Sequence, residues 1–300
     1  MAHEAPPFRS GFVAVVGRPN VGKSSLVNAL VGTKVAIVSD RPQTTRFPIR
    51  GIADGLDHQI VFVDTPGYHR PRTALGERLN RRVDDAVSQV DAVLQVVDAA
   101  AGVGRGDAFV AEREVKPFGR KKLAAVNKID LVRGHKEVPE LVAASRLAEF
   151  DHIVPTSART GLGVDELRRA IVSTLPEGDL LFPVGTLTDQ TVELRIAESI
   201  REKAVQITRE EVPHSIAVVI EEIERDRATG FVTVSCSILV ERESQKGILV
   251  GKGGETLKRI GSTAREELER LLGARMHLDI RVKVLKEWQR DPAALDRLGF

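Results

Sequence analysis

The chain has 300 residues, of which 42% are hydrophobic and 29% charged, so it is long enough and apolar enough for two globular domains. Its net charge of +2 gives no argument for nucleic-acid binding through bulk charge, which leaves that function to local clusters. The single cysteine, Cys236, excludes an internal disulfide framework and a multi-cysteine metal site, and we expect it to be a buried structural thiol. Because the chain has neither an apolar run of about 18 residues nor a signal-peptide core, we expect a cytoplasmic protein.

Strand-like apolar runs alternate with helical patterns in the first half of the chain. The predicted strands are 12–16, 59–63, 92–97, 123–126 and 152–155. The predicted helices are 24–31, 77–87, 137–149 and 164–175. This alternation predicts a mostly parallel sheet covered on both faces, with a ligand site at the carboxyl ends of the strands.

A phosphate-binding motif follows the first predicted strand. The sequence GRPNVGKS, residues 17–24, fits G-x-x-x-x-G-K-[ST] and opens the first predicted helix, which is the context that this motif requires. Its glycines let backbone N–H groups approach phosphates closely. We expect Lys23 to reach the β- and γ-phosphates and Ser24 to ligate Mg²⁺. The predicted phosphate-binding residues are Gly17, Arg18, Pro19, Asn20, Val21, Gly22, Lys23, Ser24 and Ser25.

Two further segments are candidates for sensing the γ-phosphate. Asp64-Thr65-Pro66-Gly67 ends a strand, so that Asp64 can hold Mg²⁺ through water and Gly67 can donate its backbone N–H to the γ-phosphate. In Pro42-Gln43-Thr44-Thr45-Arg46, one threonine is expected to complete the Mg²⁺ shell when the γ-phosphate is present. We favour Thr45 over Thr44; the other interpretation is a polar surface loop. The predicted catalytic residues are Lys23, Thr45 and Gly67, and the predicted metal ligands are Ser24, Thr45 and Asp64.

A guanine pocket is predicted at the ends of the two last strands of this half. The Asp130 carboxylate of Asn127-Lys128-Ile129-Asp130 can accept hydrogen bonds from N1–H and the exocyclic amine of guanine, a donor pair that adenine lacks. Asn127 either ties this loop to the phosphate loop or contacts N7, and the Lys128 stem can lie over the base. Thr156-Ser157-Ala158 can offer backbone N–H groups to O6. The predicted nucleotide-binding residues outside the phosphate loop are Asp64, Thr65, Pro66, Gly67, Asn127, Lys128, Asp130, Ser157 and Ala158.

The motifs together resemble those of the translation-factor branch of P-loop GTPases, and GRPNVGKS, QTTR, DTPG and NKID are similar to those of the Era family. Small GTPases often carry a water-positioning glutamine directly after D-x-x-G, where this chain has Tyr68. Relatives of the Era family also lack the glutamine but usually have an aliphatic residue there. The Tyr68 ring is either retracted or takes part through its hydroxyl, and His69 is expected to be solvated. We therefore expect slow intrinsic turnover that a partner accelerates.

The pattern changes after residue 176. Residues 177–190, with two glycines and no period, are predicted to link a domain at 8–176 to a domain at 191–300. The second domain is predicted to contain a helix at 191–208, strands at 214–224 and 231–241, an apolar turn at 248–250, a helix at 255–272 and a strand at 277–285. This order predicts an α+β fold.

A glycine loop, Gly251-Lys252-Gly253-Gly254, starts the second of these helices. Cations surround it, and a tight turn of this kind can clamp a nucleic-acid backbone, as in the KH module. The predicted RNA-binding residues are Gly251, Lys252, Gly253, Gly254 and Lys258. An ordinary turn beside a solvated helix face is the alternative. Arg281 and Lys283 either extend the RNA groove or form a solvated face, and Trp288 is expected to pack against its own domain.

The segments GILVGKGGETLKRIG, EEVPHSIAVVIEEIE and DPAALDRLGF extend the resemblance to the Era family over nearly the whole chain. The resemblance implies a Ras-like α/β P-loop GTPase domain followed by an α+β type II KH domain. It also implies a GTP/GDP- and Mg²⁺-dependent switch that binds the 3′ end of 16S ribosomal RNA, assists assembly of the 30S subunit, and can associate peripherally with the inner face of the cell membrane. We expect a monomer. One rival, a ribosome-assembly GTPase with two G domains, fails because the chain has only one phosphate-loop match. The other two are a nucleotide-independent RNA-binding module and a membrane-trafficking GTPase, which no lipidation motif supports.

Overall fold

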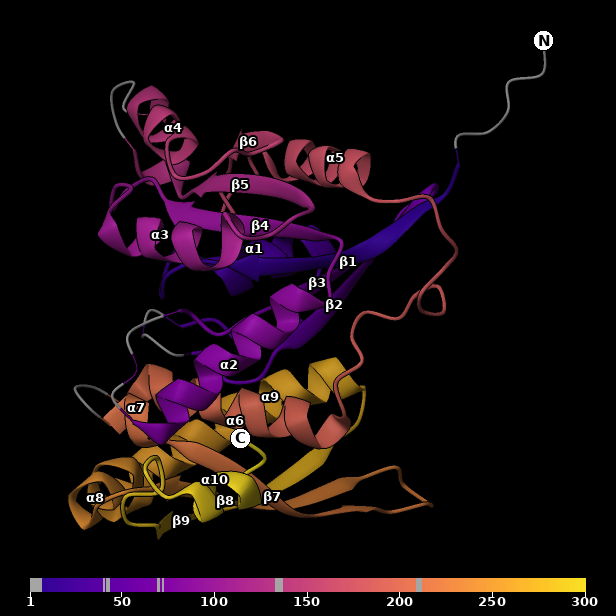
Figure 1. Cartoon of the computed structure of the whole chain (residues 1–300). Coiled ribbons are helices and arrows are strands. Elements are labelled where there is room, and N and C mark those ends of the chain that lie inside the picture. Colours follow the sequence, from indigo (N-terminus) through magenta and orange to yellow (C-terminus); the bar gives the residue numbers. More distant parts are fainter. Residues whose placement is uncertain are drawn as a thin grey trace. The chain divides into compact units, whose positions relative to one another are not determined.

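The computed structural model of the chain describes residues 7–39, 41, 44–68, 71, 73–132, 137–208 and 212–300. It divides into two compact units (Figure 1). The first comprises Met1–Val38, Thr45–Arg72 and Gly76–Asp189, and the second comprises Ser39–Thr44, Thr73–Leu75 and Gln190–Phe300. No helix of the described residues has the length and hydropathy to cross a membrane.

A six-stranded sheet in the order β2-β3-β1-β4-β5-β6 forms the centre of the first unit. Its strands are β1 (Arg9–Val16), β2 (Ile49–Asp54), β3 (His58–Asp64), β4 (Ala92–Asp98), β5 (Lys121–Asn127) and β6 (His152–Pro155). All neighbours pair in parallel except β2, which pairs antiparallel with β3. The mostly parallel sheet is therefore confirmed, but β2 was missed.

Helices cover both faces of this sheet, as predicted. They are α1 (Lys23–Val31), α2 (Ala74–Ser88), α3 (Arg105–Val110), α4 (Glu137–Ser145) and α5 (Val164–Thr174), with a π-helical turn at Ala111–Val115 and a 3-10 turn at Ile129–Leu131. Apolar residues of α1 and α5 share one core cluster with the sheet, and those of α2 and α3 share another. The short α3 was not predicted. The helix predicted to reach residue 149 ends at Ser145, because Arg146 and Leu147 donate to carbonyls only three residues back.

The second unit packs helices on a three-stranded sheet in the order β7-β8-β9. Its elements are α6 (Val192–Ile207), α7 (Val212–Ser215), β7 (Ala217–Arg225), β8 (Val232–Val240), α8 (Glu243–Val250), a 3-10 turn (Lys252–Gly254), α9 (Glu255–Leu272), β9 (Met276–Val284) and α10 (Pro292–Arg297). β8 pairs antiparallel with β7 and parallel with β9. This is the arrangement expected of the predicted type II KH fold.

Two predictions about the second unit need correction, and its short helices α7, α8 and α10 were not predicted. Residues 248–250, predicted as an apolar turn, are the last turn of α8, and α8 itself was missed. The strand predicted from residue 214 begins at Ala217, since the short helix α7 precedes it.

Two buried side chains have the surroundings expected from the sequence. Cys236 is buried in the core of the second unit. Trp288 is fully buried, donates from Nε1 to the Ser215 carbonyl at 3.0 Å, and stacks on Phe300. Its ring therefore belongs to the domain core and presents no face to an RNA base.

Candidate nucleotide-binding site

The phosphate loop joins the end of β1 to the start of α1, so the free N–H groups at the helix N-terminus face the turn. Lys23 is buried, and its Nζ donates to the carbonyls of Gly17 and Arg18 at 3.1 and 3.2 Å. The Arg18 guanidinium turns away from the loop to Asp107, with Nε 3.0 Å from Oδ1. The loop is thus curled around the Lys23 ammonium, as a cradle for phosphate requires.

Three oxygen-bearing side chains converge beside this loop. Ser24 Oγ donates to Asp64 Oδ2 at 2.6 Å, and Thr45 Oγ1 lies 3.0 Å from Ser24 Oγ and 3.3 Å from the same carboxylate oxygen. Asp64 Oδ1 is buried, with no hydrogen-bond partner among the described residues. Burial raises the pKa of Asp64, opposed by the hydrogen bond from Ser24 and by the charge of Lys23. A hard cation such as Mg²⁺ fits this oxygen set, with phosphate and water oxygens completing its shell.

The two threonines of the intervening loop differ in direction. Thr45 is buried and faces Ser24 and Asp64, whereas the Thr44 hydroxyl donates to the Arg41 carbonyl at 2.6 Å. The geometry therefore supports Thr45 as the Mg²⁺ ligand. Pro42 and Gln43 of this segment, and His69, lie outside the described residues.

The loop after β3 lies directly against the phosphate loop. Thr65 Oγ1 donates to the Val15 carbonyl at 2.7 Å. A Cβ atom at Gly67 would lie 2.9 Å from Pro19 Cα, so only glycine allows this approach of the two backbones. The segment from Asp64 through Pro66 to Gly67 is thus placed next to the position expected for the γ-phosphate.

The loops after β5 and β6 are tied to each other and to the phosphate loop. Asn127 Nδ2 donates to the Val21 carbonyl at 2.9 Å, and Asn127 Oδ1 accepts from the Ala158 N–H at 3.1 Å. Of the two roles considered for Asn127, the structure shows the tie to the phosphate loop. Lys128 Nζ reaches the Asn20 carbonyl at 2.6 Å, so its stem spans the space between the two loops.

The Asp130 carboxylate is oriented by hydroxyl and guanidinium groups. Ser157 Oγ donates to Oδ1 at 2.6 Å, and Arg159 lies 2.7 Å from Oδ2. The hydrogen bond from Ser157 and the charge of Arg159 lower the pKa of Asp130. The group is therefore ionised at neutral pH and can only accept hydrogen bonds, as recognition of guanine requires.

Two acidic side chains of the site were missed in the sequence. Asp98 ends β4 and binds Lys128 Nζ at 2.6 Å through Oδ2, while Oδ1 accepts from the N–H groups of Ala100 and Ala101. A carboxylate at a strand end was a signal that could have identified it. Asp107 is fully buried and anchors Arg18, and no local pattern announces a partner 89 positions away.

The Tyr68 ring is retracted from the site. It is buried among apolar residues of α2 and α3. The centroid of the Tyr68 ring lies 5.6 Å from the centroid of the Phe109 ring and 5.0 Å from Arg113 Cζ. Burial and the nearby Asp84 raise the pKa of Tyr68 to about 12. The hydroxyl therefore stays protonated at neutral pH, and the neighbours of the ring, Phe109 and Arg113, lie outside the nucleotide motifs.

We expect Tyr68→Phe to hydrolyse GTP within about twofold of the unchanged protein in single-turnover assays, because the hydroxyl lies outside the site. Tyr68→Ala removes the ring and is expected to lower the free energy of unfolding by about 3–5 kcal/mol. A tenfold loss of rate in Tyr68→Phe, with an unchanged melting temperature, would instead give the hydroxyl a part in hydrolysis.

Lys23 is expected to take up a proton when nucleotide binds. Burial lowers its pKa to about 8, only partly opposed by Asp64. Phosphate groups would stabilise the ammonium and raise this pKa again. At about pH 8.5, binding should therefore take up about 0.7 proton, and at about pH 7 only about 0.1. Calorimetric titration with GDP in buffers of different ionisation enthalpy measures this, and equal uptake at both pH values would contradict it.

A second candidate site, for RNA, is the loop between α8 and α9 in the second unit. Gly253 and Gly254 have φ of 61° and 82°, and a Cβ on either would meet no atom within 4 Å. Lys252, within this open turn, and Lys258, in the first turn of α9, are both exposed. By contrast, Arg281 and Lys283 of β9 are paired with Asp279 and Glu221. These pairs support the solvated interpretation of that face.

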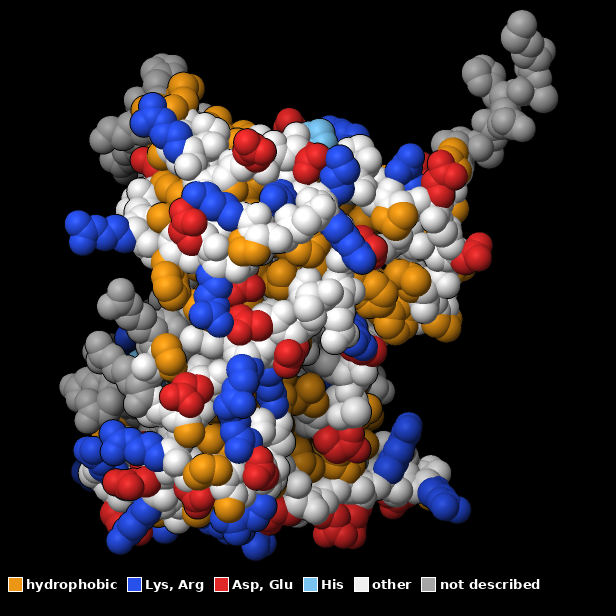
Figure 2. All heavy atoms as spheres, in the orientation of Figure 1, with side chains coloured by type: hydrophobic (Ala, Val, Ile, Leu, Met, Phe, Trp, Pro, Cys, Tyr) orange, Lys and Arg blue, Asp and Glu red, His pale blue; other side chains and the backbone are white. Residues whose placement is uncertain are grey.

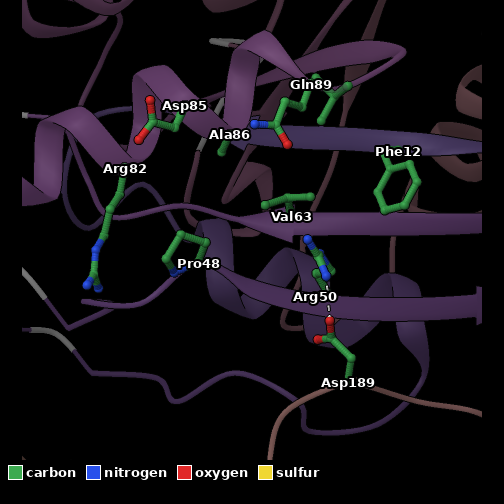
Figure 3. A pocket seen from close by; sticks show the side chains of 10 residues that line it. Phe12, Pro48, Arg50, Val63, Arg82, Asp85, Ala86, Gln89 and Asp189 are labelled. Atoms are coloured by element: carbon green, nitrogen blue, oxygen red, sulfur yellow. Dashed lines mark hydrogen bonds and ion pairs between the residues drawn. The ribbon is translucent and has the colours of Figure 1, made fainter. Parts of the chain in front are cut away.

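A cavity of about 580 Å³ lies in the first unit, between α2 and the β2 side of the sheet (Figure 3). Phe12, Val63 and Ala86 give it apolar walls, and the Arg50–Asp189 ion pair, at 2.7 Å, lies at its edge. None of the residues in the nucleotide motifs lines it. The cavity is therefore no part of the nucleotide site.

Two family models match the parts of the chain that contain most of the nucleotide site and the glycine loop. Residues 12–128 match the model of a family described as 50S ribosome-binding GTPase, and residues 211–289 match the KH domain. The chain is 50% identical over 297 residues to the GTPase Era of Mycobacterium tuberculosis and to that of Mycolicibacterium smegmatis, covering 98% of this chain and 99% of each relative.

Two solved structures are also similar over almost the whole chain. A crystal structure of Era with MgGDPNP and nucleotides 1506–1542 of 16S ribosomal RNA has a TM-score of 0.94 and 39% identity, covering 97% of this chain and 99% of that one. A variant of Aquifex aeolicus Era bound to GDP·AlF4⁻ has a TM-score of 0.93 and 40% identity, with the same coverage.

Proposed function

Because this chain belongs to the Era family of GTPases and hydrolyses GTP with Mg²⁺, we propose that it is a switch that binds the 3′ end of 16S ribosomal RNA and assists assembly of the 30S subunit. The observation that carries the proposal is that one chain holds both a nucleotide site with converging Ser24, Thr45 and Asp64 and an open, lysine-flanked glycine loop. The similar Era structure contains a GTP analogue and an RNA together.

Each side chain of the nucleotide site has a proposed task. Ser24, Thr45 and Asp64 would hold Mg²⁺, which supplies positive charge against the β- and γ-phosphates when bound. Lys23 would neutralise charge that develops on the transferred phosphoryl group, and the Gly67 N–H would hold the γ-phosphate. Asp130 would select guanine, supported by Ser157 and by the ties that Asn127 makes between the loops.

We propose that intrinsic hydrolysis is slow. With Tyr68 retracted, no described side chain stands after Gly67 to position the attacking water. A partner or a bound RNA would then set the time that the protein spends in its GTP state. Single-turnover hydrolysis by the purified protein measures this, and a rate of many events per second without a partner would contradict it.

The glycine loop gives a sharp test of RNA binding. Gly253→Asp places a carboxylate where an RNA phosphate would lie, and two like charges about 4 Å apart repel by about 1–4 kcal/mol, so affinity for a 16S 3′-end fragment should fall about tenfold or more. The matched control is Gly230→Asp in the β7–β8 turn, which also has positive φ and open space around it. Equal affinity of the two variants would remove the RNA site from this loop.

Coupling between the two sites is tested with the intact protein. RNA affinity is measured with a GTP analogue, with GDP and without nucleotide. A ligand shifts only the states that it binds differentially, so a switch requires different affinities in the three samples. Equal affinities would leave both binding activities in place and remove the coupling.

We further propose a nucleotide-binding domain at 8–176, a linker at 177–190 and an RNA-binding domain at 191–300, in a monomeric cytoplasmic protein. We propose that any association with the inner membrane face is peripheral and made through the surface of the protein. No described helix could span a bilayer. Sedimentation of the protein with and without inner-membrane vesicles distinguishes the two locations.

A further inference from the structure

An exposed apolar surface lies on the first unit, away from the nucleotide loops. It is formed by the tip of the β2–β3 hairpin and by the chain between α5 and residue 189. The side chains that form it, named here the linker surface, are Leu56, Leu180, Leu181, Val184 and Leu187, with exposed fractions of 105%, 50%, 42%, 74% and 48%. Contiguous exposed apolar side chains of this kind mark interaction sites more often than isolated ones do.

The backbone beneath the linker surface is held in place. The side-chain amide of Gln59 donates to the Phe182 carbonyl at 3.0 Å and accepts from the Leu181 N–H at 2.8 Å. The Gly185 N–H donates to Asp54 at 2.7 Å, and the Ile52 N–H donates to the Leu187 carbonyl at 2.9 Å. These bonds bring the hairpin and the linker together into one surface. A partner would therefore lose little free energy in ordering it.

The end of the linker is fixed by an ion pair. Arg50 of β2 binds Asp189 at 2.7 Å, two residues beyond Leu187, and Figure 3 shows this pair at the edge of the cavity. The linker surface thus lies beside β2, at the edge of the six-stranded sheet. It is a preformed part of the first unit.

The charges around the linker surface are mostly negative. Residues 51–59 and 176–189 contain five carboxylates and no lysine or arginine. The carboxylates are those of Asp54, Asp57, Glu177, Asp179 and Asp189. The hydrogen bond with His58 lowers the pKa of Asp57. Arg50 pairs with Asp189, and Arg9 lies beside Glu177 through a backbone bridge, so five carboxylates here face two arginines. Figure 2 shows hydrophobic side chains gathered where this part of the chain runs, with both acidic and basic side chains nearby.

We infer that the linker surface docks a protein segment that is rich in lysine and arginine and carries aliphatic side chains. Apolar side chains of such a segment would cover the five exposed residues, and its cations would meet the acidic border. An anionic membrane is disfavoured, because its negative surface potential repels the same carboxylates. The inference rests on the proposed function, which brings the protein to a ribosomal particle where segments of this chemistry are available.

Photochemical crosslinking tests the inference on the full chain. Val184 is replaced by the photoreactive p-benzoylphenylalanine, and the protein is irradiated on purified 30S subunits with a GTP analogue. A matched chain carries the same residue in place of Val138, which is 63% exposed on α4. We expect position 184, and not position 138, to crosslink to a lysine- and arginine-rich segment of one ribosomal protein, identified by mass spectrometry.

Charge and apolar contacts are then tested separately. Asp57→Lys with Asp179→Lys should lower the yield of the crosslink about tenfold, and a synthetic peptide of the crosslinked segment should bind Leu181→Ser/Val184→Ser about tenfold more weakly. The control pair is Val138→Ser/Val142→Ser, which should leave peptide affinity unchanged.

Two kinds of result would overturn the inference. One is crosslinking from position 184 only to RNA, or no more strongly than from position 138. The other is binding to anionic vesicles of phosphatidylethanolamine and phosphatidylglycerol that is lost in Leu181→Ser/Val184→Ser, which would make the surface a membrane contact. Co-sedimentation with the subunits is recorded in the same samples. If the protein without any Ser or Lys substitution fails to co-sediment with the subunits, the proposed function is contradicted. If it co-sediments but gives no crosslink to a protein, only the docking surface is contradicted.

Discussion

Lys23→Met is expected to lower the rate of GTP hydrolysis roughly a thousandfold or more. The loss of one preorganised neutral donor to developing charge costs about 10²–10³ in rate, and a charged donor is the stronger kind. Lys23 is buried in the phosphate loop, where its Nζ donates to the carbonyls of Gly17 and Arg18, so methionine would remove the ammonium from the centre of the loop. Single-turnover hydrolysis of GTP, together with nucleotide affinity, measures the effect.

The same substitution is not expected to unfold the protein. Burial lowers the pKa of Lys23 to about 8, so at neutral pH the nucleotide-free fold carries an unfavourably buried ammonium that methionine does not have. The matched control is Lys116→Met, whose ammonium lies on the surface beside Glu112. An equal loss of activity in both variants, or a lower melting temperature in Lys23→Met alone, would mean that the assay reports stability instead of phosphate contact.

Lys23→Met also separates the switch from a nucleotide-independent RNA-binding module. If the first unit were only a scaffold, loss of nucleotide contact would leave ribosome association in cells unchanged. If the protein is a switch, association should respond to Lys23→Met and remain normal in Lys116→Met. The two readouts, hydrolysis in solution and association in cells, therefore test different links of the proposed function.

Local patterns predicted the parts of the fold that strong periodicity defines. The helix 255–272 was predicted with the bounds that it has, because its apolar residues recur at helical spacing after a glycine turn. The edge strand β2 was missed, because Arg50, Gly51 and Asp54 interrupt any apolar run. The glycines at 247 and 251 made the end of α8 look like a turn, although tertiary packing of Leu249 in the core favours the helix.

The candidate site shows the same division. A local motif such as that of residues 17–24 predicts a phosphate-binding loop, because the residue types that the loop requires are neighbours in sequence. Side chains that pair only in the folded structure, far apart in sequence, form no local motif. Arg18 was predicted as a phosphate-binding residue, but its guanidinium pairs with Asp107, which comes from a helix that was itself unpredicted. Likewise, only the structure could decide between a retracted and an engaged Tyr68.

Asp130→Asn is expected to invert the base preference of the site. The ionised carboxylate accepts from both donors on the guanine edge, whereas an asparagine amide presents a donor to one of them. Sites built for hydrogen bonding reject mismatched analogues by about 10⁴–10⁵, so we expect the specificity constant for GTP to fall at least about a thousandfold. Xanthosine triphosphate replaces the exocyclic amine by a carbonyl, which the new amide N–H can bind, so its hydrolysis should rise correspondingly.

The surroundings of Asp130 make this change a local one. The amide oxygen of asparagine can still accept the Ser157 hydroxyl that now binds Oδ1 at 2.6 Å, and only the ion pair with the largely exposed Arg159 is lost. Exposed ion pairs contribute about 0–1 kcal/mol, so folding should be unaffected. Asp165→Asn, which breaks the exposed pair with Arg168, serves as the matched control. If Asp130→Asn kept its preference for GTP over xanthosine triphosphate, the base would have to be read elsewhere, because no other contact proposed here distinguishes an amine from a carbonyl at that edge.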